Sequence, residues 1–305
     1  MGAGHGHFHD ARAGHAGGRY RSRLAAAFAL VSGFFAVELV TGIVSGSLAL
    51  ISDAGHMAAD VVALGAALVA TKIATRPDST GRRTYGSYRA EVFASGLTVL
   101  IMLGVAAYVV IEAISRINGE PDVASTPMLV VGAIGLGINI ACMLLLRAGS
   151  RQSLNVKGAY FEVVADAAGS VGVMIAGVLV MFTGKGLWDT LVALTIGIFV
   201  AVRALVLGRQ VLAVLGQHVP EGMMLAEVVA DLESVSGVGG IHDLHIWTLT
   251  SGMNVATAHI VVGDGVAVQD VLTEAQRVLA ERHHIEHATL QVEEAPTSRC
   301  HEVNW

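Results

Sequence analysis

Long apolar runs separated by short polar segments dominate the chain between residues 24 and 207. About 20 predominantly apolar residues are enough for a helix to cross the hydrocarbon of a bilayer. Six windows meet this requirement: Leu24–Val44, Leu48–Ile73, Ala90–Ile114, Met128–Leu146, Ala159–Phe182 and Leu187–Leu207. The pattern therefore predicts a polytopic α-helical membrane domain with six spans.

The pattern changes after Leu215, where the segment GQHVPEG has the turn chemistry of a domain boundary. Apolar residues then recur at helical spacing over 225–235 and 268–279, and they alternate with polar ones in IHDLHIWTLT, NVATAHIVV and HATLQVE. The resulting order αββαβ predicts an α+β domain in which two helices cover one face of a small sheet. We expect an arm at 1–23, a transmembrane domain at 24–210 and a C-terminal domain at 211–305.

Composition and charge agree with a membrane protein and orient it. The chain of 305 residues is 53% hydrophobic and 14% charged, which is too apolar for an ordinary soluble protein. Most Lys and Arg lie before the first span, after the second, fourth and sixth spans, or in the tail, whereas only Arg116 and Lys185 flank the opposite ends. The positive-inside rule thus predicts cytoplasmic termini, and the compact loops favour a bacterial inner membrane.

Four ionisable residues lie inside the predicted spans as two pairs spaced four apart: His56 with Asp60, and Glu162 with Asp166. That spacing places both members of a pair on one helix face. A charged carboxylate at the membrane centre costs about 2.5 to 3.5 kcal/mol on insertion scales. We expect the interiors of the spans to contain no Lys or Arg that could offset this cost, because we place Arg203 at the end of the sixth span. A divalent metal bound between the second and fifth spans is the favoured interpretation, and helix-packing hydrogen bonds or a hydrated cavity are the alternatives.

Other polar residues in or near the spans are expected to be structural. Asp53, three residues before His56, could be a fifth ligand, but we expect it to cap the second helix or to face water. Glu38, Glu112 and Asn139 are unpaired at four-residue spacing, so we expect interhelical hydrogen bonds or interface positions.

The ligand types also suggest how an ion would move. An imidazole has an unperturbed pKa near 6.5, and carboxylates in a cavity of low dielectric titrate within reach of cellular pH. Because ligands must lose protons to bind metal, metal and protons displace each other. The sequence has no HExxH helix and no nucleophile with a base, so an intramembrane metalloenzyme is disfavoured and no enzyme activity is expected. A metal sensor remains an alternative to a transporter.

Four segments carry a resemblance to a known family: SDAGHMAAD, RRTYGSYRAE, SLNVKGAYFEVVADAAGSVGV and IHDLHIWTLTSG. Over residues 20–295 the chain resembles the cation diffusion facilitators, in particular their bacterial zinc, cobalt and cadmium exporters. The resemblance implies six spans, a ferredoxin-like, metallochaperone-like cytosolic domain, and a homodimer that exports Zn(II) from the cytoplasm in exchange for protons by alternating access. It also implies that His56 and Asp60 are transport-site ligands.

One position departs from the family pattern. Many zinc members place His and Asp four apart in the fifth span, and here Asp166 matches the Asp whereas Glu162 occupies the His position. A carboxylate in place of imidazole favours ions that accept oxygen ligands. We therefore expect discrimination to relax in favour of ions such as Co(II) or Mn(II), and a broader exporter of Co(II), Cd(II) and Mn(II) from the same family is the alternative.

Further metal ligands are expected outside the membrane. In family members with a metal-binding arm, cytosolic zinc sites use the positions of His242, His259 and Glu293, and Cys300 and His301 are additional candidates. Gln291 stands where some relatives have another histidine. The arm, expected to be disordered on its own, offers further weak ligands at His5, His7 and His9.

The remaining charged residues of the tail suggest no further partner. His245 and His287 are ambiguous, and His283 and His284, beside Arg282, are expected to be solvated. Nucleic-acid binding is not expected, because the tail has only three arginines from which to build a basic patch. Contact with lipid is inevitable, but the sequence indicates no lipid-specific site.

Overall fold

The computed structural model describes residues 16–73, 84–116, 119, 122–146, 154–250 and 252–295, with side chains except at 16–27, 63–64, 66–73, 145–146 and 154–162. Contacts divide these residues into two compact units. One contains the long helices up to Gly208, and the other contains the chain from Arg209 together with the segment that ends at Phe93.

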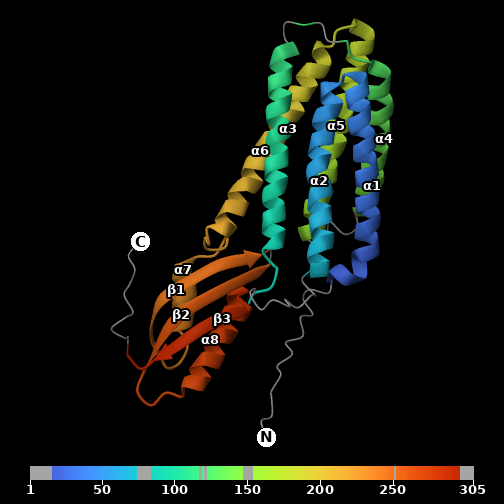
Figure 1. The fold of residues 1–305 in the computed structure, drawn as a ribbon. Helices are drawn as coiled ribbons and strands as arrows, with labels where there is room; N and C mark the ends of the chain where they lie inside the picture. Colours follow the sequence, from blue (N-terminus) through green and yellow to red (C-terminus); the bar gives the residue numbers. More distant parts are fainter. Residues whose placement is uncertain are drawn as a thin grey trace. The chain divides into compact units, whose positions relative to one another are not determined.

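Six long helices follow one another along the chain (Figure 1), and each contains one of the predicted spans: α1 Ala16–Ser45, α2 Leu48–Ile73, α3 Ala90–Arg116, α4 Ser125–Leu146, α5 Leu154–Thr183 and α6 Leu187–Leu215. Within the described residues, all of them except α2 contain an apolar window long enough to cross a membrane. The helices extend beyond the predicted windows at several ends. Residues 16–23, expected in a disordered arm, are the first turns of α1, because extending an existing helix costs much less than nucleating one.

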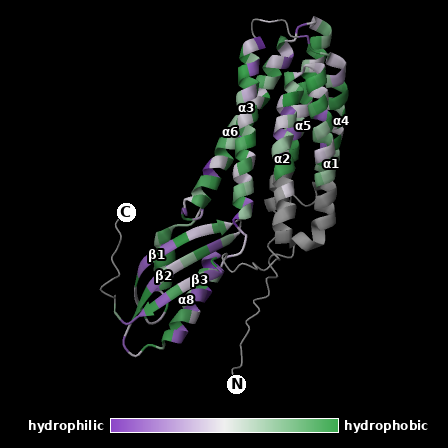
Figure 2. Cartoon of the chain, viewed as in Figure 1, coloured by the Kyte–Doolittle hydropathy of each residue, from purple (hydrophilic) through white to green (hydrophobic). Residues whose placement is uncertain are grey.

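The core of the helical unit is built mainly from small and branched side chains contributed by α2 to α6. Its buried members include Leu48 and Leu50 of α2, Val109 of α3, Met128 of α4, Val173 and Ala176 of α5, and Ala193 of α6. Large apolar side chains also point outward, with Val44 82% and Phe182 80% exposed. Figure 2 shows hydrophobic residues along much of the described length of these helices. An apolar exterior is stable only when lipid covers it.

The second unit has the predicted order αββαβ: α7 Leu225–Glu233, β1 Val238–Thr250, β2 Met253–Val262, α8 Val268–His283 and β3 His287–Glu293. The sheet order is β1-β2-β3, with β1 antiparallel and β3 parallel to β2. Helices α7 and α8 share one core with the strands, in which Val228 and Leu279 meet Ile246 and Ile260. The prediction of two helices on one face of a small sheet is confirmed.

Strand alternation decides which residues of β2 the helices cover. Ala256, Ala258 and Ile260 are buried, whereas His259 alternates with them and lies on the opposite side of the pleat. His242 of β1 is the register partner of His259, and Gln291 of β3 pairs with it from the other edge. The sheet therefore gathers imidazole and polar side chains on the face that the helices leave open.

Candidate functional site

A histidine and two carboxylates meet between α2 and α5. His56 and Asp60 lie one helical turn apart on α2, and each offers a ligand atom within 4.8 Å of those offered by the other members of a cluster with Asp166 of α5. The His56 Nε2 atom lies 3.0 Å from Asp166 Oδ1, and the His56 side chain is only 5% exposed. One nitrogen and two oxygen donors at this spacing suit a divalent transition metal.

Glu162, the fourth predicted ligand, lies in α5 one turn before Asp166. The helix places the two residues on the same face, but the side chain of Glu162 lies outside the described residues. Three of the four residues predicted for the transmembrane site are thus brought together in the described part of the chain.

The expectation that no cation lies inside the spans is wrong. Arg203 is well inside α6, which continues to Leu215, and its Nη1 atom lies 2.9 Å from His56 Nε2. The guanidinium also lies over the ring of Phe199, one turn earlier, at 5.9 Å from the ring centroid. Its position in an apolar run of the sixth predicted span was a usable signal, because charges within spans usually line functional sites.

Asp53 does not cap α2 or face water, so that expectation is also wrong. Its carboxyl group is hydrogen-bonded to that of Glu38 in α1, and the two residues are 6% and 1% exposed. A Cβ atom added to Gly169 of α5 would lie 2.7 Å from Asp53 Oδ1. The absence of a side chain at Gly169 therefore allows α5 to approach Asp53 closely.

The other polar span residues have structural partners. The interhelical bond expected of Glu38 is confirmed by its contact with Asp53. Asn139 of α4 donates to Ser170 Oγ of α5 at 3.4 Å, as expected. Glu112 instead accepts from Arg116 Nε on its own helix at 2.8 Å, four residues later.

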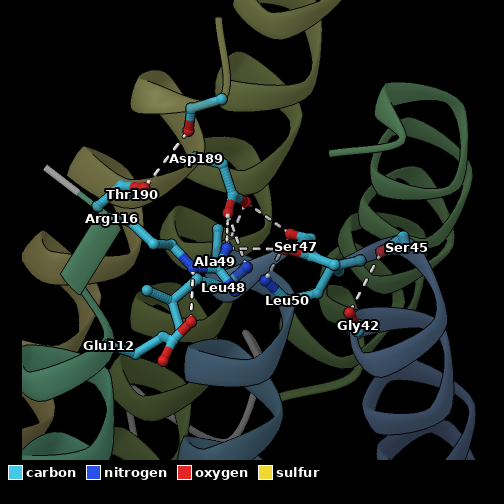
Figure 3. A network of polar contacts seen from close by, with 12 residues as sticks. Gly42, Ser45, Ser47, Leu48, Ala49, Leu50, Glu112, Arg116, Asp189 and Thr190 are labelled. Atoms are coloured by element: carbon cyan, nitrogen blue, oxygen red, sulfur yellow. Dashed lines mark hydrogen bonds and ion pairs between the residues drawn. The ribbon is translucent and has the colours of Figure 1, made fainter. Parts of the chain in front are cut away.

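The start of α2 is held by a polar network that the sequence did not suggest (Figure 3). Asp189, fully buried at the start of α6, accepts hydrogen bonds from Ser47 Oγ at 2.6 Å and from the backbone amides of Leu48 and Ala49 at 2.7 and 3.1 Å. Arg116 Nη1 lies 3.8 Å from the same carboxylate and donates to the Gly46 carbonyl at 2.9 Å. The network satisfies amide groups that a helix start leaves unpaired.

A second cluster lies on the open face of the sheet unit. His242, His259 and Glu293 offer ligand atoms that all lie within 4.8 Å of one another. Glu293 Oε1 is 3.0 Å from His259 Nδ1, and Glu293 Oε2 is 3.7 Å from His242 Nε2. The Glu293 side chain is 5% exposed and the two histidines are 17% and 20% exposed. Two imidazoles and a carboxylate form a common three-ligand set for zinc, so the donors fit a bound metal.

Two further residues, Asp243 and Gln291, contact members of this cluster. Asp243 lies at an irregularity of β1 with φ of 53°, and its Oδ2 atom is 3.7 Å from His259 Nε2. Gln291 donates to Glu293 Oε1 at 2.6 Å. The sequence analysis did not predict Asp243, because regular strand alternation would have put it on the face of the sheet opposite His242. Its place between the two histidines of IHDLH was nevertheless a usable signal.

The remaining tail histidines differ from one another. His283 was expected to be solvated, which is wrong, because it contacts Asp231 Oδ2 at 2.9 Å and its side chain is 11% exposed. His284 is exposed and ends α8 with φ of 54°. His245 lies 3.0 Å from Asp243 Oδ1, and His287 stacks edge-on against Tyr85 with ring centroids 5.5 Å apart. The candidates Cys300, His301, His5, His7 and His9 lie outside the described residues.

A polytopic helical protein with an α/β unit, and with one metal-type cluster in each part, belongs to the class of ion-handling membrane proteins. Residues 24–215 match the cation efflux transmembrane domain, and residues 220–295 match the cation efflux protein cytoplasmic domain. The chain therefore belongs to the cation efflux family: it is an integral membrane transporter with a cytoplasmic C-terminal domain, and not an enzyme. The expected resemblance is confirmed.

Named relatives lie in the same family. The metal cation efflux system protein CzcD of Cupriavidus metallidurans is 44% identical over 98% of this chain and 93% of its own. The cadmium, cobalt and zinc/H(+)-K(+) antiporter of Bacillus velezensis is 34% identical over 95% and 92%. A solved structure, the metal-bound C-terminal domain of the CzcD transporter of C. metallidurans, is 42% identical, covers 23% of this chain and 99% of its own, and has a TM-score of 0.23.

Proposed function

We propose that the protein exports divalent transition metal, foremost Zn(II), from the cytoplasm in exchange for protons. The single observation that carries the proposal is the cluster of His56, Asp60 and Asp166 inside a helical membrane unit. One imidazole and two carboxylates whose ligand atoms all lie within 4.8 Å of one another form a donor set for a divalent transition metal. A relative that is named as a cadmium, cobalt and zinc/H(+)-K(+) antiporter supports exchange of these metals for other cations, protons included.

In this mechanism the metal is the cargo, and the chain's residues bind and release it. Asp60 and Asp166 neutralise the charge of the ion, His56 supplies the nitrogen donor, and Glu162 is proposed as the fourth ligand. Protons that enter from the opposite side occupy the same atoms and displace the ion. With three carboxylates in the set, we propose that Co(II) and Mn(II) are also accepted, because these ions take more oxygen ligands. The name of the Bacillus relative supports Cd(II) as a further cargo.

The cytoplasmic cluster is proposed as a regulatory zinc site. His242, His259 and Glu293 would hold the metal, whose role there is to join strands β1, β2 and β3 through their side chains. Cys300, His301 and the arm residues His5, His7 and His9 are proposed as additional ligands. We propose a homodimer in a bacterial inner membrane, with both termini cytoplasmic, and with divisions at 1–23, 24–210 and 211–305.

The test is transport by the purified full-length protein in proteoliposomes with a metal-sensitive dye inside. With a proton gradient imposed, the unmodified protein is expected to accumulate Zn(II) against its gradient, whereas Asp60→Ala and Asp166→Ala are expected to lose uptake. Asp122→Ala is the matched control, because this carboxylate is exposed in the loop before α4 and lies outside both clusters. Unchanged uptake in both aspartate variants would contradict the proposal. Zinc binding that never leads to uptake would favour a metal sensor.

A further inference from the structure

Two groups of opposite chemistry contact one nitrogen of His56. Arg203 Nη1 lies 2.9 Å from Nε2, and Asp166 Oδ1 lies 3.0 Å from the same atom. A guanidinium only donates hydrogen bonds and a carboxylate only accepts them. When Nε2 carries no proton, which is the form that binds a metal, Arg203 donates to the same lone pair that the metal would use.

The guanidinium also supplies the charge that this cluster needs. His56 is buried, and Asp60 and Asp166 place two carboxylates within 4.8 Å of its ligand atom. Asp60 and Asp166 are partly buried, with the Asp166 side chain 21% exposed, and two carboxylates so close together repel each other unless a positive group lies nearby. A positive group on α6 at hydrogen-bond distance offsets that repulsion without belonging to either ligand-bearing helix.

Arg203 has a second partner on its own helix. Its side chain is long and flexible, and the guanidinium already lies over the face of Phe199 on the same helix. An aromatic face stabilises a cation, so Phe199 provides a partner for the guanidinium when it withdraws from His56. Arginine remains charged under all physiological conditions, so only movement removes its charge from the site.

We propose that Arg203 is an internal counter-cation that occupies the transport site in place of metal and is displaced when the metal binds. This inference rests on the proposed transport site at His56, Asp60 and Asp166. Arg203 is not a ligand. It lowers the affinity for the ion, because binding requires that the guanidinium leaves, and it helps release, because its return to His56 competes with the bound metal.

The test is equilibrium Zn(II) binding to the full-length protein in lipid nanodiscs, by competition with a chelating dye at about pH 7.5, above the ordinary imidazole range. A parallel Asp60→Ala sample identifies the transport-site fraction. Arg203→Gln is expected to tighten this fraction about tenfold, which corresponds to about 1.4 kcal/mol. Arg203→Lys, which retains the charge, is expected to change the affinity less. Arg209→Gln is the matched control, because Arg209 is exposed six residues later.

A transport assay separates this role from a structural one. Arg203→Gln is expected to lower both KM and the maximal rate for Zn(II), because the ion binds more tightly and leaves more slowly. A merely structural residue would instead lower the rate with an unchanged or higher KM. If Arg203→Gln does not fold, Arg203→Met, which retains an unbranched apolar stem, takes its place with the same expected direction.

The outcomes distinguish the two proposals. Unchanged or weaker zinc affinity in the charge-removing variant would overturn the role of Arg203 while leaving the transport site in place. If the unmodified protein and Asp60→Ala bind zinc equally, the transport site itself is wrong, and the role of Arg203 fails with it. Tighter binding in the charge-removing variant, with little change in Arg209→Gln, supports the counter-cation.

Discussion

Ser47 and Asp189 join the beginnings of α2 and α6, with Ser47 Oγ donating to Asp189 Oδ1 at 2.6 Å. The hydroxyl also accepts from the Leu50 amide at 3.1 Å, so Ser47 caps the helix while Asp189 binds the amides beside it. The helix held in this way is the one that carries His56 and Asp60. The helix that carries these two proposed ligands is therefore fixed at one end to α6.

Removing the Asp189 carboxylate is expected to destabilise the helical unit. Asp189→Ala leaves the Ser47 hydroxyl and two amides without their buried acceptor, at an expected cost of about 2 to 4 kcal/mol in unfolding free energy. Asp189→Asn retains one acceptor oxygen and should cost less. Thermal unfolding in detergent measures the difference. Asp122→Ala, an exposed control, should leave the melting temperature nearly unchanged. If Asp189→Ala melts at the same temperature as this control, the hydrogen bonds of Asp189 to the start of α2 do not stabilise the helical unit.

Close approach between α2 and α5 requires glycine at position 169. A Cβ atom there would lie 2.7 Å from Asp53 Oδ1, so Gly169→Ala must displace the buried Asp53–Glu38 pair. We expect a loss of about 1 to 3 kcal/mol, together with weaker transport, because α2 and α5 carry the proposed ligands.

Gly104→Ala is the matched control for this prediction. Gly104 lies in α3 with no atom within 4 Å of an added Cβ, and alanine is the better helix former by about 1 kcal/mol. The two variants should therefore shift the melting temperature in opposite directions. Equal shifts would show that the space at Gly169 is not limiting.

The backbone conformation of Asp243 and its carboxylate are expected to have separate effects, the first on stability and the second on zinc binding. The φ of 53° is unfavourable for most residues, and the carboxylate lies 3.7 Å from His259. Asp243→Ala is expected to lower stability by about 1 kcal/mol and to weaken zinc binding at the cytoplasmic cluster. Asp243→Gly should retain stability while weakening zinc binding to the same extent.

Both effects are measured on the full-length protein in an Asp60→Ala background, where the remaining zinc binding is assigned to the cytoplasmic cluster. His259→Ala, which removes a proposed ligand, defines the complete loss. Glu286→Ala, at an exposed position outside the cluster and without a positive φ, should change neither quantity. If Asp243→Gly binds zinc as tightly as the unmodified protein, the carboxylate does not contribute to the site.

Periodicity predicted the elements well, because apolar length and strand alternation are local properties of the sequence. The six long helices, five of which contain within their described residues an apolar window long enough to cross a membrane, and the order αββαβ could be predicted in this way, and the four-residue spacing placed His56 and Asp60 on one helix face. The contacts between residues of different helices could not be predicted, because the pattern along one chain does not say which helices pack against each other. Arg203 lies 147 residues after His56 and Asp189 lies 142 after Ser47, so their contacts depend on the packing of α6 against α2.

The same limit explains the error at Asp53. Its distance from the start of the span suggested a cap or contact with water, since carboxylates are rarely buried without a partner. The partner is Glu38 on α1, and the glycine that makes room is on α5. The burial of Asp53 therefore depends on three helices, whereas its position in the sequence carries information about only one of them.

The identity of residue 162 is expected to set the metal range. Glu162 and Asp166 lie one turn apart on α5, so the proposed site contains three carboxylates and one imidazole. Glu162→His replaces an oxygen donor by a nitrogen donor, which favours Zn(II) over ions that prefer oxygen. Transport of Co(II) and Mn(II) relative to Zn(II) should therefore fall severalfold, measured as initial rates in the same proteoliposomes.

Glu162→Gln is the control, because it removes the charge and retains an oxygen. If the charge of residue 162 alone sets the metal range, Glu162→Gln and Glu162→His should change the Co(II)/Zn(II) and Mn(II)/Zn(II) transport ratios equally. If the type of donor atom sets the metal range, only Glu162→His should lower these ratios. Unchanged ratios in Glu162→His would show that residue 162 does not bind the transported ion, and the site would then consist of His56, Asp60 and Asp166 with solvent as the fourth ligand.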